Sequence, residues 1–350
     1  MALASQDVRD ALRRHQAFWE WAEAEKPLVS TVRWPHHAIH DFDWGLLNPE
    51  GILHPEMLVV DHFMPQYESY YEAGGVLDGD LFWPAVPPRA VPWLEGIVGC
   101  SIRYSTTYGS IVTEPAISDW SWCPQLEPLS DNLWFKKLVE FTKGLVRLAA
   151  GRFPVAVSHT RGPWDLVSAL RGMENVYLDV YDHPTELRRL AEMCADVWIE
   201  VTKHLAEIIP AWQGGYVGIF GLWAPKFTPT PQNDSSVSVS AKMYRELMLP
   251  ADSRTVHAWQ SPVFHLHSAG SHLVECVLDI LEGRALNVVI DPAGPSLDEL
   301  LSILRRVQAW RIPLHLISTD WEQIEELTAT LSSCGLAVSY VPLSQPREFT

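Results

Sequence analysis

The second half of the chain alternates between short runs of branched apolar residues and longer stretches with apolar residues at helical spacing. The short runs predict strands over residues 28–33, 155–159, 216–220, 263–267, 286–290, 314–318 and 336–340, with an eighth within 99–117. Helical spacing predicts helices over 133–150, 184–209, 241–259, 272–281, 297–310 and 321–333. Strands that alternate with helices are typical of βα units in a parallel sheet.

About eight such units in one chain of 350 residues predict a (β/α)8 barrel, an α/β fold. Asp131 and Asn132 precede the first of the long helices and are N-cap candidates. Residues 36–128 differ from the rest, because they are rich in Pro, Trp and Tyr and show little periodicity. We interpret them as an irregular N-terminal insertion that covers the active-site end of a single domain spanning 1–350.

Charge and composition exclude several classes of partner. The chain has 26 Lys and Arg against 43 Asp and Glu, a net charge of −17, which disfavours nucleic acid and anionic membranes. Neither GxGxxG nor GxxxxGK[ST] follows a predicted strand, so we expect no nucleotide cofactor. Five cysteines without a CxxC pair, a charged N-terminus and no unbroken apolar span indicate a cytoplasmic protein with reduced thiols.

In a (β/α)8 barrel the residues that follow each strand converge on one mouth. Several of them are polar or aromatic, and they are the candidates for substrate binding and catalysis. Each has a simpler reading: Asp291 and Asp320 as helix caps, Arg161 on a surface loop, and 34–44 as a solvated loop. The candidates are His159, Arg161, Trp223, His267 and Asp291, together with Trp34, His36 and His37 after the first strand.

His265 and His267 are two residues apart on a predicted strand, so their side chains share a face. Two imidazoles on one face bind a metal such as zinc if another strand supplies a third ligand; otherwise they are ordinary buried polar groups. His267 is nearer the strand end and is the stronger candidate for a ligand or a general acid/base. Arg161 beside His159 offers a guanidinium fork for a carboxylate.

The chain contains sixteen tryptophans, more than its eleven phenylalanines or ten tyrosines. Trp34, Trp44, Trp164 and Trp223 fall beside predicted strand ends or within the insertion. Flat apolar rings at a barrel mouth predict a pocket for a flat, uncharged or cationic ligand.

Four ordered blocks resemble the uroporphyrinogen decarboxylase superfamily, which also contains cobalamin-dependent methyltransferases. They are GPWDLVSALRGMENVYLDVYDHPTELRRL (162–190), GLWAP (221–225), NDSSVSVSAKMYRELMLP (233–250) and VFHLHSAGSHLVECVLD (263–279). The resemblance implies the barrel fold. It also implies roles for Asp234 as a ligand, general acid or anchor, and for Glu246 as a ligand, although a turn residue and a solvated helix face explain these two equally well.

Two departures from the family pattern bear on the activity. The arginine-rich RQAGR motif that holds porphyrinogen carboxylates is absent, with only Arg33 in a comparable place, so the chain is not expected to be a true uroporphyrinogen decarboxylase. Zinc methyltransferases carry His-x-Cys, whereas this chain keeps His267 and has Ala269 in place of the cysteine. Any metal site is therefore rebuilt from other residues, for which we name His267, His265 and Glu246.

Three hypotheses follow. The first is methyl transfer between a small, aromatic or methylated substrate and a corrinoid or similar carrier on a partner protein, assisted by a divalent metal such as zinc. The second is a decarboxylase or lyase in which Arg161 holds a carboxylate and Asp234 or His267 protonates the carbanion. The third is a barrel that binds a ligand without reaction. The catalytic candidates are His267, Asp234 and His159, and a homodimer is among the expected assemblies.

Overall fold

The computed structural model describes residues 6–31, 50–72, 76–105, 107, 110–121 and 126–341. Its centre is a five-stranded parallel sheet in the order β1, β12, β11, β10, β9. Parallel pairing places the carboxyl ends of all five strands along one edge. The predicted strands in these places are confirmed within the described residues: β1 (Leu28–Thr31), β9 (Val263–His267), β10 (Ala285–Val289), β11 (Leu314–Ser318) and β12 (Leu336–Tyr340).

A further extended segment, residues 228–232, runs parallel to β9 on its free side. The backbone N–H of Val263 donates to the carbonyl of Pro229 at 3.1 Å, and that of His265 donates to the carbonyl of Pro231 at 2.9 Å. Proline has no N–H and rarely occurs inside a sheet, so the sequence TPTPQ does not predict a strand. This segment ends immediately before Asp234 and brings that residue beside β9.

The strand predicted over 216–220 is present only at its first two residues and lies outside the parallel sheet. β7 (Tyr216–Val217) pairs antiparallel with β8 (Trp223–Ala224) in a short hairpin, with Gly221 in its turn at a φ of +82°. Trp223 packs with Phe82 and Trp212 against α1 (Gln6–Trp19), and its backbone N–H donates to His15 Nδ1 at 3.1 Å. Trp223 is thus a core residue of the hairpin.

On the other side of β1, the chain around β3 (Leu77–Asp78) and β4 (Leu81–Phe82) continues the hydrogen bonding. The backbone N–H of Asp80 donates to Val29 at 2.8 Å, and that of Ala85 donates to Pro154 at 2.8 Å. The N–H of Ala156 returns a bond to Ala85 at 2.9 Å, so the predicted strand at 155–159 is present as an extended segment.

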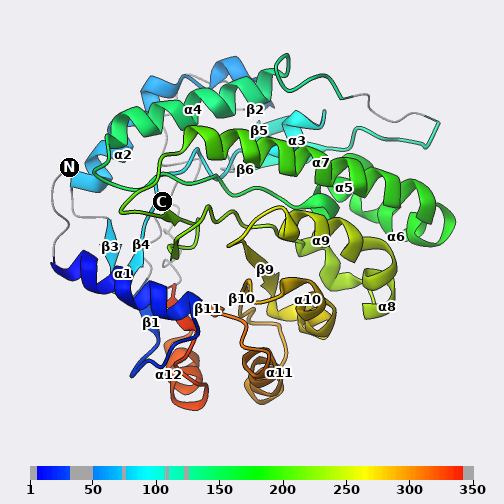
Figure 1. Ribbon diagram of the computed structural model, residues 1–350. Helices are drawn as coiled ribbons and strands as arrows, with labels where there is room; N and C mark the ends of the chain where they lie inside the picture. The colour runs from blue at the N-terminus through cyan, green and yellow to red at the C-terminus, as the bar shows by residue number, and fades with distance from the viewer. Residues whose placement is uncertain are drawn as a thin grey trace.

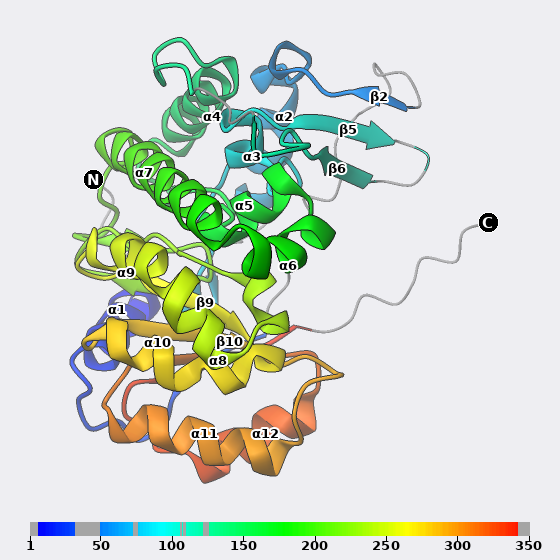
Figure 2. The ribbon, with the colours of Figure 1, turned by 90° about the vertical axis from the view of Figure 1, so that its right-hand side faces the viewer.

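The strand expected within 99–117 does not join this sheet. β5 (Ser101–Ser105) pairs antiparallel with both β6 (Ser110–Glu114) and β2 (Glu50–Ile52), and these three strands form a separate sheet (Figure 2). Burial alternates along β5, because only one face of this sheet is covered. The described parts of 36–128 also contain η3 (Pro55–Met57), α2 (Val60–Glu72) and α3 (Trp93–Ile97), so regular elements occur within this region.

The predicted helices agree with the structure to within a few residues, except that 241–259 is split by a π-helical turn and 272–281 begins as a 3-10 helix. Asn132 caps α4 by accepting from the Phe135 N–H at 2.9 Å. No described helix is long and apolar enough to cross a membrane. The remaining helices are α4 (Leu133–Ala149), α5 (Pro163–Arg171), α6 (Met173–Asp182), α7 (Pro184–Ile208), η4 (Asp234–Ser238), α8 (Ala241–Met243), η5 (Tyr244–Met248), α9 (Leu249–His257), η6 (Ser268–Leu273), α10 (Val274–Leu281), α11 (Leu297–Ala309) and α12 (Trp321–Thr330).

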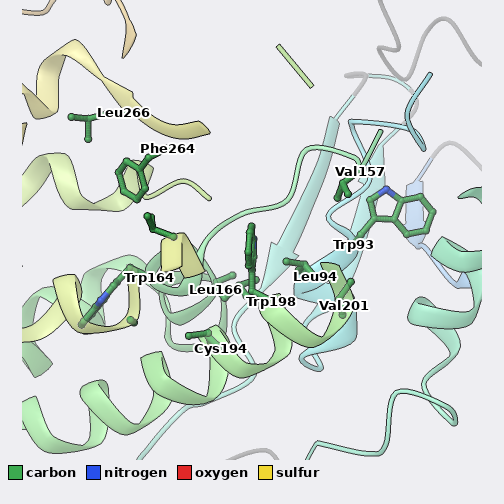
Figure 3. Packing of buried hydrophobic residues seen from close by; sticks show 14 of the residues in the cluster. Trp93, Leu94, Val157, Trp164, Leu166, Cys194, Trp198, Val201, Phe264 and Leu266 are labelled. Carbon is green, nitrogen blue, oxygen red and sulfur yellow. The ribbon is translucent and has the colours of Figure 1, made fainter. Parts of the chain in front are cut away.

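α12 packs against β11 and β12, and in Figure 1 α11 and α12 lie below the strands of the parallel sheet, whereas α4 and α7 lie at the opposite side of the molecule. The strands β9, β10, β11 and β12 are buried along almost their whole length. Trp164 and Trp198 are fully buried in the apolar core between α7 and β9 (Figure 3). Trp164 therefore fills the core and lines no ligand pocket.

Candidate metal centre

Two histidines of β9 and one aspartate converge at the carboxyl edge of the sheet. Asp234 Oδ1 lies 3.6 Å from His265 Nε2 and 3.8 Å from His267 Nε2. The two rings are nearly perpendicular, with centroids 5.1 Å apart. The parallel pairing of 228–232 with β9 brings these side chains together, because Asp234 lies just beyond the end of 228–232 and His267 is the last residue of β9.

The second nitrogen of His267 binds an aspartate from the neighbouring strand. His267 Nδ1 donates to Asp291 Oδ1 at 2.7 Å, and Asp291 Oδ2 accepts from Ala269 N at 3.1 Å and from Ser268 Oγ at 3.3 Å. A carboxylate can only accept, so Nδ1 carries a proton, and Nε2 is the nitrogen that offers a lone pair in the neutral form of the ring. Asp291, which stays a predicted substrate-binding residue, is hydrogen-bonded to His267 in the structure.

His265 is held in the same way by an amide. Its Nδ1 lies 2.6 Å from Asn287 Oδ1, an oxygen that can only accept. Burial lowers the pKa of His265 to about 4, so the ring is neutral at physiological pH and its Nε2 also presents a lone pair.

Asp234 Oδ1 faces both of these lone pairs and is itself buried, and no described residue donates a hydrogen bond to it. Burial raises the pKa of Asp234. Three acceptor atoms without a proton or donor between them are costly unless a cation binds there. Ligands at about 2.1 Å from a tetrahedral metal lie about 3.4 Å apart, close to the observed spacing.

The donor set of two imidazoles and one carboxylate fits a borderline divalent metal with at least one open position. Asp234, His265 and His267 each offer one ligand atom, and these three atoms lie within 4.8 Å of one another. Among the described His, Cys, Asp and Glu residues, they are the group of three that meets this distance. No described cysteine belongs to the group: Cys100, Cys194 and Cys276 are buried elsewhere and Cys334 is half-buried. The candidate site therefore offers nitrogen and oxygen donors where the zinc methyltransferase pattern has thiolates.

Asp165, at the start of α5, holds the loop that carries Asp234. It accepts from the backbone N–H of Asp234 at 3.2 Å and of Ser235 at 2.8 Å. Burial and the charge of Asp234 raise the pKa of Asp165 to about 6. Sequence reasoning missed this residue, although an acidic residue in the first turn of a helix after a predicted strand was a usable signal.

A second buried carboxylate supports the same loop from α9. Asp252 Oδ2 accepts from Asn233 Nδ2 at 2.9 Å and from the Tyr244 hydroxyl at 2.8 Å. Burial raises the pKa of Asp252 to about 7. Nothing in the local sequence indicated this contact, because it depends on the π-helical turn between Tyr244 and α9.

A cavity of about 350 Å³ opens beside Asp234 and brings together three predicted site residues, Asp234, His159 and Arg161. Arg161 Nε lies 3.2 Å from Glu95 Oε1, and burial raises the pKa of Glu95. Burial and the nearby Arg89 lower the pKa of His159 to about 3, so its ring is neutral and is no acid at physiological pH. Arg89 and Glu95 also line the cavity and were missed from the sequence.

The other predicted site residues lie elsewhere. Trp223 packs against α1, as described above. Glu246 is exposed on η5 and stands outside the group formed by Asp234, His265 and His267. Asp320 caps α12 by accepting from the Glu322 N–H at 2.9 Å, which is its simpler reading. Trp34, His36 and His37 lie outside the described residues.

Comparisons with known proteins agree with this arrangement at the level of family and fold. The profile of the family described as Uroporphyrinogen decarboxylase (URO-D) matches residues 94–292, more than half of the chain. A solved structure described as a methyltransferase from Methanosarcina mazei superposes with a TM-score of 0.60 at 12% identity, covering 95% of this chain and 93% of that one. No curated protein sequence matches the chain significantly. At this identity the likeness shows the fold alone.

Proposed function

The chain belongs to the uroporphyrinogen decarboxylase family, and we propose that it is a metal-dependent enzyme that transfers a methyl group between a small substrate and a carrier. One observation carries the proposal: the buried Asp234 Oδ1 has no donor and faces the Nε2 lone pairs of His265 and His267. Such a group is a costly arrangement in a folded protein without a cation. The fold of the Methanosarcina methyltransferase supports the choice of reaction class.

The fold that we propose for this enzyme is a closed (β/α)8 barrel. The five strands β1, β12, β11, β10 and β9 would be followed by 228–232, then the segment from 155, then 80–85, which returns to β1. Hydrogen bonds join most of these neighbouring segments. Between 228–232 and the segment from 155, the Cα of Gly162 packs directly against the carbonyl of Gln232. A closed barrel places the metal centre and the cavity at one mouth, where such enzymes have their active sites.

In this proposal, different residues of the site hold the metal, orient its ligands and bind the substrate. His265, His267 and Asp234 hold the metal, which when bound supplies a Lewis acid that lowers the pKa of a substrate hydroxyl, thiol or water. Asp291 keeps the proton of His267 on Nδ1 and so keeps Nε2 available. Arg161 and the neutral His159 border the cavity and bind polar or anionic groups of the substrate.

The carrier that we propose is a corrinoid on a partner protein. In the transfer the methyl group leaves the carrier without its bonding electrons. The nucleophile supplies the electron pair for the new bond and releases its proton. Ile111, Val112 and Thr113 of β6 form one wall of the cavity in which these groups would meet.

The test begins with purified protein loaded with zinc or cobalt(II) and incubated with methylcobalamin and a panel of thiols, phenols and amines. We expect about one metal per chain and loss of the methylcobalamin absorbance with one class of acceptor, both abolished in His267→Ala. A wild-type protein that binds no divalent metal would contradict the proposal. Release of carbon dioxide from carboxylated aromatic or pyrrolic compounds, without any methyl carrier, would replace it with the lyase reaction.

A further inference from the structure

A row of buried polar side chains crosses the parallel sheet beside the metal centre. It consists of Asn287 on β10, His315 on β11 and Ser339 on β12, and each of the three is 0% exposed. In the strand register Asn287 stands opposite both His265 and His315. Polar groups are costly at the centre of an apolar sheet unless each finds a partner, so the pairing within the row has few alternatives.

The orientation of the Asn287 amide is fixed from outside the row. Asn287 Nδ2 donates to the backbone carbonyl of His315 at 3.2 Å, and a carbonyl can only accept. The amide oxygen must therefore face His265, whose Nδ1 lies 2.6 Å away. A flipped amide would set two oxygens against each other at His315, so His265 has to carry its proton on Nδ1.

The remaining members of the row agree with this arrangement. Asn287 Nδ2 also donates to His315 Nδ1 at 3.1 Å, so this nitrogen is an acceptor and the proton of the neutral ring is on Nε2. His315 Nε2 in turn donates to Ser339 Oγ at 2.9 Å. Every donor in the row therefore meets an acceptor in one arrangement, which has the proton of His265 on Nδ1 and the proton of His315 on Nε2.

We infer that Asn287, His315 and Ser339 are positioning residues that fix the tautomer of His265 and thereby turn its Nε2 lone pair toward Asp234. Without a partner for Nδ1, the carboxylate of Asp234 would draw the proton to Nε2, 3.6 Å away, and a protonated Nε2 cannot bind a metal. The inference rests on the proposed metal centre for its purpose, but the tautomer exists in the metal-free protein and can be observed there.

The experiment compares Asn287→Leu, which removes the amide at similar volume, with Val288→Ala, a buried substitution on the next residue of β10. In metal-free protein with 15N-labelled histidine, NMR should show His265 protonated on Nδ1 in the wild type and in Val288→Ala, and on Nε2 in Asn287→Leu. Zinc affinity, measured by competition with a chromophoric chelator, should fall about 10- to 100-fold in Asn287→Leu alone.

A gradient along the row provides a second measurement if Asn287→Leu does not fold. Ser339→Ala is farthest from His265 and should lower zinc affinity least, whereas Asn287→Asp, which keeps an acceptor for Nδ1, should retain the Nδ1 tautomer. An unchanged tautomer in Asn287→Leu, loss of the Nδ1 tautomer in Asn287→Asp, or an equal fall of affinity in Val288→Ala overturns the inference. A wild-type chain with the stated tautomer that binds no zinc would refute the proposed function and leave the positioning role intact.

Discussion

His267 and Asp291 are joined across the ends of two neighbouring strands by a 2.7 Å hydrogen bond, in which the histidine donates and the carboxylate accepts. The parallel pairing of β9 with β10 brings the two residues together, because it aligns His267 with Val289, two positions before Asp291. The bond determines which nitrogen of His267 is free for a metal.

Asp291→Asn should weaken zinc binding by about tenfold or more, because an amide is a weaker acceptor for Nδ1 and its NH2 group would face the Ala269 N–H. Asp320→Asn is the matched control, since Asp320 also follows a parallel strand but only caps α12. It should leave both the zinc affinity and the free energy of unfolding nearly unchanged, because Asn caps a helix about as well as Asp. Chelator competition and urea denaturation measure the two quantities, and equal affinities of both variants would contradict the role of Asp291.

Asp234→Asn should abolish stable metal binding while the metal-free protein becomes as stable as the wild type or more so. The asparagine removes a buried carboxylate oxygen without a donor and supplies an NH2 group that can donate to His265 Nε2 or His267 Nε2. Metal analysis and thermal unfolding after chelator treatment measure both effects. Glu246→Gln should change neither, and a Glu246 variant that loses metal would restore the ligand predicted from the sequence.

Gly162→Ala should destabilise the fold by more than about 3 kcal/mol, because the new Cβ would lie 1.7 Å from the carbonyl oxygen of Gln232 and no rotamer relieves a backbone clash. The clash also displaces the segment that carries Asp234. Gly283→Ala has open space around its Cβ and only the strain of a φ of +84°, so it should cost about 1 kcal/mol. Chemical denaturation of both variants decides between them, and similar losses would argue against the close contact.

Asp252 and Asp165 should contribute stability to the metal-free protein that is lost as the pH rises from about 4 through about 7, whereas the buried neutral His159 and His265 contribute in the opposite direction. Burial raises the folded-state pKa of Asp252 to about 7 and that of Asp165 to about 6, so the folded chain holds protons that the unfolded chain has released. Each group contributes a slope of up to about 1.4 kcal/mol per pH unit between its two pKa values. The difference in free energy of unfolding between the wild type and Asp252→Asn, measured by urea denaturation, should therefore fall as the pH rises through this range, and a difference that does not change with pH would show that Asp252 does not titrate there.

The alternation of apolar runs and helical stretches was sufficient to predict the strands β9, β10, β11 and β12 and the long helices between and around them. Such runs are buried on both faces, so their character is local and can be read directly from the residues. The same local reasoning placed His265 and His267 on one face at a strand end. It failed at 216–220, because an apolar, glycine-rich run forms a hairpin there, and at 228–232, because two prolines conceal an extended segment.

The sequence was sufficient to name several residues of the candidate site, but not to show which of them contact one another. Asp234 was named as a candidate, yet only the pairing of 228–232 with β9 shows that its Oδ1 meets two Nε2 atoms. Asn287 gave no comparable signal, because its role arises from contacts between residues far apart in the chain. Burial patterns follow from local composition, whereas strand order, register and the pairing of buried polar groups depend on long-range hydrogen bonds, and those are defined only in the folded chain.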